Sequence, residues 1–223
     1  MGFRRVAVNR ILRWLVDSLC KIDSVQLREA VSHNKPMIVA MNHINFLDVP
    51  IIVSHAYPVY MTGLAKVETW KNPVFSYIFN TYKAIPIDRN GSFRDAFRKV
   101  REALTNGFFV IIAPEGTRSS NGVLGQGKAG IIQLALECNT PVLPVVHYGG
   151  EHFWKNIRRL KRTAICFKPG RPFLIKPNGT VGKSVRTKIL DEIMGQMARL
   201  LPEELRGNYA DQANEDCKYL EFV

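Results

Sequence analysis

Short apolar runs recur along the chain, separated by segments whose apolar positions repeat at helical spacing. The runs contain almost no charged side chain, which is typical of strands buried on both faces of a sheet. They predict strands at residues 37–41, 59–64, 84–87, 108–113, 142–147, 164–167 and 173–175. The strand at 84–87 contains Pro86, which has no N–H to donate, so we expect it to be irregular or to lie at an edge.

The intervening segments predict helices at residues 46–55, 73–80, 130–138 and 185–201. A further helix begins after Ser92, which is its predicted N-cap, and carries Asp95 at the capping-box position. Asn106 and Gly107 end this helix.

This order of elements predicts an α/β fold: a single domain with a central, largely parallel (mixed) sheet flanked by helices, plus an N-terminal amphipathic helix. We assign residues 1–34 to the N-terminal amphipathic segment, 35–210 to the α/β domain and 211–223 to a polar, loosely held tail. Ligands of such sheets bind beyond the carboxyl ends of the strands. Functional residues are therefore expected in the loops that follow the strands.

The segment at residues 3–22 is the predicted N-terminal helix. Its apolar positions share helical spacing and include Ile11, Leu12, Leu15, Val16 and Leu19. Two alternatives stay open: this stripe packs on the domain, or it lies in a membrane interface with Trp14 at the level of the headgroups. No apolar run is long enough to predict a transmembrane helix.

The chain carries a formal net charge of +12. Two stretches hold most of it: residues 1–21 have five cations against Asp17, and residues 151–171 have seven against Glu151. Such an excess indicates an anionic partner, unless the two stretches are simply solvated faces. No nucleic-acid-binding motif accompanies the charge, so we expect no nucleic acid partner. The four cysteines show no metal-ligand spacing, which predicts reduced thiols and no metal site.

The loop after the strand at 37–41 contains His43 and, five residues later, Asp48 at the start of the next helix. If the loop folds back, the carboxylate of Asp48 holds one imidazole nitrogen and leaves the other free as a general base. The alternative is that Asp48 only caps the helix and His43 is an ordinary loop residue.

The loop after the strand at 108–113 offers Glu115, Gly116, Thr117 and Arg118. A guanidinium beside a hydroxyl and a glycine backbone suits a phosphate, although a polar turn with an internal Glu–Arg pair fits the same residues equally well. Arg89, which follows the strand at 84–87, is a second candidate cation at the same sheet edge.

Taken together, four segments resemble the ordered blocks of the glycerol-3-phosphate and 1-acylglycerol-3-phosphate acyltransferase family. Asn42-His43-(x)4-Asp48 is similar to its catalytic HX4D block, and Glu115-Gly116-Thr117-Arg118-Ser119 to its phosphate-binding block. Ile87-Asp88-Arg89 and Val142-Leu143-Pro144-Val145 match the other two. The resemblance covers roughly residues 35–210. The sequence departs from the family pattern at Asn45, Lys83, Pro86 and Ala113, in blocks that shape the acceptor pocket.

The resemblance implies an O-acyltransferase that moves a fatty acyl group from acyl-CoA or acyl carrier protein to a lysophospholipid, with 1-acylglycerol 3-phosphate expected first. His43 is then the base and Asp48 its partner, while Arg89, Glu115, Gly116, Thr117 and Arg118 bind the acceptor. No cofactor is expected. We expect a peripheral enzyme on an anionic membrane surface, at the cytoplasmic face. The alternative is a non-catalytic, basic lipid- or membrane-binding module on the same fold, although such a module needs neither His43 nor Asp48.

Overall fold

The computed structural model describes residues 3–32, 35–87, 93–177, 179, 181–214 and 216–223. The strands are β1 Cys20–Asp23, β2 Ile38–Met41, β3 Met61–Lys66, β4 Ile85–Ile87, β5 Phe109–Ile112, β6 Val142–Tyr148, β7 Thr163–Pro169, β8 Phe173–Ile175 and β9 Leu220–Phe222. The α-helices are α1 Phe3–Leu19, α2 Val25–Ser32, α3 Asp48–His55, α4 Pro73–Thr81, α5 Phe93–Thr105, α6 Gly130–Cys138, α7 Phe153–Ile157 and α8 Lys183–Leu200. Short 3-10 helices precede α4 (Val67–Lys71) and α7 (Gly150–His152), and three more follow α8 (Glu203–Leu205, Gly207–Tyr209 and Gln212–Asn214).

The strands form one mixed sheet in the order β1-β7-β6-β2-β5-β3-β4. Outside this order, β8 pairs with β6, and β9 pairs with β8. The neighbours from β6 to β4 are all parallel, whereas β7 and β8 run antiparallel to β6. The predicted largely parallel sheet is thus confirmed. Because β2, β5 and β6 are parallel neighbours, the loops that follow them meet at one edge of the sheet.

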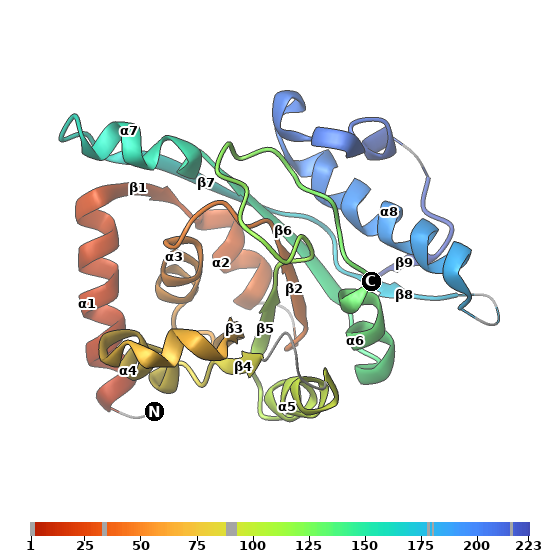
Figure 1. Ribbon diagram of the computed structural model, residues 1–223, viewed down its shortest axis with the longest axis horizontal. Coiled ribbons are helices and arrows are strands. Elements are labelled where there is room, and N and C mark those ends of the chain that lie inside the picture. Colours follow the sequence, from red (N-terminus) through yellow and green to blue (C-terminus); the bar gives the residue numbers. More distant parts are fainter. Residues whose placement is uncertain (1–2, 33–34, 88–92, 178, 180, 215) are drawn as a thin grey trace.

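Helices cover both faces of the sheet (Figure 1). In β2, Ile38 and Ala40 pack into the core beneath α5, α6 and α8, whereas Val39 and Met41 pack toward α1, α2 and α3. Two cores on opposite faces account for the apolar side chains at every position of the central strands. The predicted irregular strand is β4, which forms one end of the sheet with Pro86 in it.

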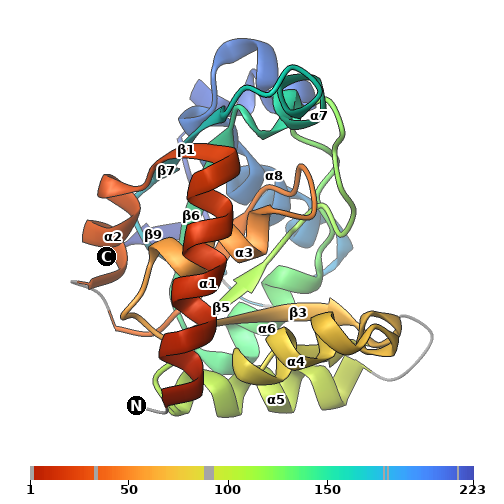
Figure 2. The same ribbon diagram turned by 90° about the vertical axis from the view of Figure 1, so that its left-hand side faces the viewer.

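Helix α1 lies along α3 and α4, on the face of the molecule that Figure 2 presents. Val8, Leu12 and Val16 are buried against the domain, while Ile11, Trp14, Leu15 and Leu19 are exposed. The predicted apolar stripe is therefore divided, and neither alternative describes all of it. Among the described residues, no helix is long and apolar enough to cross a membrane.

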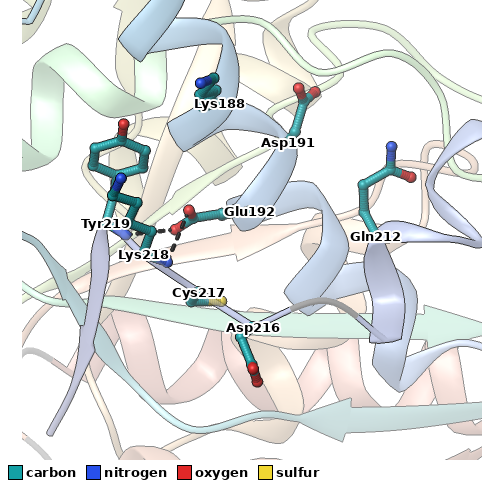
Figure 3. Close-up of a pocket in the computed structure, with 8 residues that line it drawn as sticks. All are labelled: Lys188, Asp191, Glu192, Gln212, Asp216, Cys217, Lys218 and Tyr219. Atoms are coloured by element: carbon teal, nitrogen blue, oxygen red, sulfur yellow. Dashed lines mark hydrogen bonds between the residues drawn. The ribbon is translucent and has the colours of Figure 1, made fainter.

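The C-terminal segment is held to the domain, so the prediction of a loosely held tail is wrong. β9 pairs antiparallel with β8 and buries Leu220. The carboxylate of Glu192 in α8 accepts the backbone N–H groups of Lys218 and Tyr219, each at 2.9 Å (Figure 3). The sheet therefore includes strands from both segments that flank residues 35–210, β1 before them and β9 after them.

Candidate active site

His43 and Asp48 meet because the loop between β2 and α3 folds back on itself. Nδ1 of His43 lies 2.7 Å from Oδ2 of Asp48. The same oxygen accepts the backbone N–H groups of Ile44 at 2.6 Å and Asn45 at 2.9 Å. A carboxylate that accepts three hydrogen bonds on one oxygen fixes the loop, and it holds His43 in the tautomer with the proton on Nδ1.

The Asp48 carboxylate stays ionised although its side chain is only 1% exposed. Burial alone raises the pKa of Asp48, but the imidazoles of His147 and His43 outweigh it and lower that pKa to about 2. The side chain of His43 is 27% exposed, and no hydrogen bond to the described residues engages its Nε2. This nitrogen is therefore open to a substrate proton.

Glu115 joins the His43 loop to the loop after β5. Its Oε1 accepts the backbone N–H of His43 at 2.9 Å, and its Oε2 accepts that of Gly125 at 2.7 Å. The backbone of Ser119 donates to the carbonyl of His43 at 2.7 Å, so the two loops are also joined directly. Burial raises the pKa of Glu115, and the two backbone donors act against this rise.

The internal Glu–Arg pair considered from the sequence is absent from the described residues, because Glu115 is committed to backbone groups. Thr117 and Arg118 are exposed next to Ser119, and thus lie beside the His43 loop. Arg89 and the N-cap Ser92 lie outside the described residues, so their positions stay predictions.

Lys128 was not predicted from the sequence to be a site residue, yet it lies over the same loop. A Cβ added to Gly116, which has φ of +66°, would sit 3.0 Å from Nζ of Lys128. The backbone N–H of Lys128 donates to the carbonyl of Pro114 at 2.9 Å. The ammonium of Lys128 therefore lies at the loop that also carries Arg118, and two cations on one loop suit an anionic group.

His147, at the carboxyl end of β6, was not predicted either. Its backbone is held by the side chain of Asn42, which donates to the carbonyl of His147 and accepts its N–H, both at 2.9 Å. Its Nε2 lies 3.5 Å from Oδ1 of Asp48. Asp48 thus lies between two imidazoles. A polar residue at the end of an otherwise apolar strand was the sequence signal.

Comparison with known proteins identifies the family of this chain. The family model described as Acyltransferase matches residues 24–148. The chain is 27% identical over 200 residues to the chloroplastic 1-acyl-sn-glycerol-3-phosphate acyltransferase BAT2 of Brassica napus. The aligned region covers 87% of this chain and 51% of the relative. It is 32% identical over 131 residues to the N-acylphosphatidylethanolamine synthase of Arabidopsis thaliana, in an alignment that covers 52% of this chain and 45% of the relative. The chain spans about half the length of these curated relatives.

The fold also matches a solved structure, the 1-acyl-sn-glycerophosphate acyltransferase of Thermotoga maritima. The TM-score is 0.59 at 22% sequence identity, and the match covers 96% of this chain and 80% of that one. At this identity the match shows a shared fold. The family match is the stronger finding, because it takes in more than half of the chain and includes His43, Asp48 and the Glu115–Arg118 loop. The chain belongs to the acyltransferase family.

Proposed function

We propose that this protein transfers a fatty acyl group from an acyl thioester to the free hydroxyl of 1-acylglycerol 3-phosphate. The observation that carries the proposal is the contact of 2.7 Å between Nδ1 of His43 and Asp48, with Nε2 open beside the loop of Arg118. The name of the Brassica napus relative supports the acceptor. The Arabidopsis thaliana relative is named for an N-acylated phosphatidylethanolamine, so acceptors other than 1-acylglycerol 3-phosphate are worth testing as well.

In the proposed reaction the acyl group passes directly from the thioester to the acceptor, without a covalent acyl-enzyme. The acceptor hydroxyl gives its proton to Nε2 of His43 as its oxygen attacks the thioester carbonyl. The tetrahedral intermediate then expels the thiolate, which takes the proton back from His43. General base catalysis of this kind contributes about 10²–10⁴-fold to the rate. The reaction uses two substrates and no cofactor, with either acyl-CoA or acyl carrier protein as the donor.

The acceptor phosphate is proposed to bind Arg118 through its planar guanidinium, with Lys128 as a second cation and Gly116 allowing close approach of the backbone. Arg89 and Thr117 are proposed to complete this subsite. Glu115 acts differently from these residues: it holds the backbone of His43 and Gly125, so we propose that it fixes the distance between base and phosphate site.

The proposed location is the surface of an anionic membrane, at its cytoplasmic face. The exposed side chains of α1 include Trp14, which is 69% exposed. In the turn after α7, Leu160 is 97% exposed and is flanked by cations at Arg158, Arg159, Lys161 and Arg162. An apolar side chain within a group of cations suits insertion among anionic headgroups.

This surface adjoins the catalytic loop. Phe46, which lies between His43 and Asp48 in the sequence, is exposed and its ring centroid is 5.8 Å from that of Trp154 in α7. In Figure 2, α7 lies near one end of α1 on the side facing the reader. A membrane on this side would bring the acyl chains of the acceptor close to His43.

Purified protein assayed with both donors against a panel of lysolipids tests the proposal. Thiol release that depends on 1-acylglycerol 3-phosphate and is lost in His43→Ala is the expected result. A protein that binds vesicles but releases no thiol from either donor with any lysolipid would instead be the non-catalytic binding module.

A further inference from the structure

His147 is the most deeply buried histidine near the site, and the proposed reaction gives it no task. Its side chain is 0% exposed, and neither ring nitrogen has a conventional hydrogen-bond partner among the residues that the structure describes. Buried polar groups without partners are rare because they have lost water without replacing it. A group of this kind beside the reacting atoms is a candidate for a functional role.

Packing and backbone hydrogen bonds hold the ring of His147 beside the carboxylate of Asp48. The ring of Phe167 stacks on it with a centroid distance of 5.2 Å. Its backbone is fixed on both sides by the amide of Asn42. The ring held in this way faces the carboxylate of Asp48, whose Oδ1 lies 3.5 Å from Nε2.

The two oxygens of Asp48 therefore have separate partners. Oδ2 accepts from His43 and from the backbone of Ile44 and Asn45, whereas Oδ1 faces His147. A distance of 3.5 Å is long for a hydrogen bond, but hydrogen bonds of catalytic groups are often long without substrate and shorten in the reacting complex.

We propose that His147 is a positioning residue of acyl transfer, which donates from Nε2 to Oδ1 of Asp48 and acts on His43 through that carboxylate. This inference rests on the proposed function. Two effects follow from the second donor. It prevents the carboxylate from rotating when His43 becomes a cation, and it makes Asp48 less basic. The proton then stays on His43 until the thiolate takes it.

The first test compares His147→Phe with His147→Gln. Phenylalanine keeps a ring that can stack on Phe167 but has no donor, whereas the amide of glutamine can place an N–H near the position of Nε2. We expect His147→Phe to lower kcat by about 10²-fold, the loss that a misplaced catalytic group can cause. The KM values of both substrates should change less than about twofold, since His147 touches neither substrate in this scheme. His147→Gln should recover most of kcat.

His55→Phe is the matched control. His55 is also a buried histidine, with its Nε2 3.0 Å from Asp17, and it lies at the far end of α3 from Asp48. This variant should lose stability and keep its kcat. If His147→Phe keeps kcat within twofold, or loses no more than His55→Phe at equal stability, the proposal is overturned.

A comparison of His147→Gln with His147→Asn covers the case in which the phenylalanine variant does not fold. The shorter amide cannot reach Oδ1, so His147→Asn should lose about as much kcat as expected for His147→Phe while His147→Gln keeps most of it, and equal kcat values of the two amide variants would contradict the proposal.

An activity-independent measurement separates this inference from the proposed function. The low-field Nδ1 proton resonance of His43 should be present in the wild type and in His147→Gln, and broadened in His147→Phe or His147→Asn. If the wild type transfers no acyl group but the resonance follows this pattern, the proposed function fails while the positioning by His147 stands. An unchanged resonance in all variants would remove His147 from this role.

Discussion

Oδ2 of Asp48 lies 2.7 Å from Nδ1 of His43, and the same oxygen ties down the backbone between them. Both residues, and the hydrogen bonds that hold them together, therefore belong to one short loop. From the segment after β5, Glu115 and Ser119 bind the backbone of His43 and not its imidazole. The orientation of the base thus depends on Asp48, and the place of the loop depends on the segment after β5.

The first prediction concerns this pair. His43→Ala should abolish acyl transfer and leave the fold intact, because the side chain is part-exposed and lies outside both cores. Asp48→Asn should lower kcat by up to about 10⁴-fold, because an amide can hold His43 in the wrong tautomer. Thiol release measures the turnover of both variants, and circular dichroism checks that they are folded. A His43→Ala variant with near-normal turnover would rule out this mechanism.

The second prediction concerns the phosphate. Arg118→Ala should raise KM for 1-acylglycerol 3-phosphate by about 10- to 100-fold, the value of a charge-assisted contact of ~1.5–3 kcal/mol. The kcat should change little, since the lost contact is mostly uniform binding. Arg118→Lys should recover only part of the loss, because lysine lacks the bidentate fork. Lys128→Ala should show a smaller rise of the same kind.

A monoacylglycerol acceptor provides the control for these variants, because it has no phosphate. Its KM should be the same in the wild type, in Arg118→Ala and in Lys128→Ala. If KM rises equally for both acceptors, Arg118 supports the loop and does not bind phosphate.

The third prediction concerns acid stability. The pKa of Asp48 falls from 3.8 to about 2 on folding, so the folded state favours the ionised form. By linkage, its contribution of ~2 kcal/mol is fully present above pH 3.8 and is lost as the pH falls through about 2. Denaturant unfolding of the wild type and Asp48→Asn should therefore show a stability difference that is constant near neutral pH and shrinks below about pH 4. A difference independent of pH would contradict the assignment.

The central strands, whose side chains are apolar on both faces, were predictable from the sequence, because a short run without charge fits a buried strand better than any exposed element. The sequence did not predict β1 and β9, which lie at the margins of the sheet and contain charged residues, such as Lys21 and Glu221. Nor did it predict α2 and α7. These four elements depend on tertiary pairing more than on local pattern.

The candidate site shows the same division. His43 and Asp48 were predictable because both belong to one loop and their spacing has a chemical meaning. His147 lies more than a hundred residues away from His43 in the sequence, and only the pairing of β2 with β6 brings it to Asp48. The backbone role of Glu115 had no local signal either, since its partners belong to other segments.

The fourth prediction concerns the proposed membrane-binding surface, which consists of the exposed side of α1 and the turn after α7. A Trp14→Ser/Leu15→Ser variant should bind vesicles less tightly, because both side chains are exposed and their loss leaves the buried contacts of Leu12 and Val16 in place. Leu160→Ser should also weaken vesicle binding, because the proposal inserts this side chain among the headgroups. Val223→Ser is the matched control, since Val223 is also exposed and is the C-terminal residue, which lies far from α1 in Figure 1.

The cations beside Leu160 should make this binding depend on charge. Each basic residue near an anionic surface contributes about 1 kcal/mol, and salt screens that attraction over a Debye length of about 10 Å at 0.1 M. Sedimentation with vesicles should therefore show binding that favours anionic lipid and weakens as salt is raised. Activity on a short, water-soluble acceptor should stay the same in the Trp14→Ser/Leu15→Ser variant, because the His43 loop is untouched. Equal binding to neutral and anionic vesicles, insensitive to salt, would refute the electrostatic part. Unchanged binding of the Trp14→Ser/Leu15→Ser variant would show that the exposed side of α1 does not contact the bilayer.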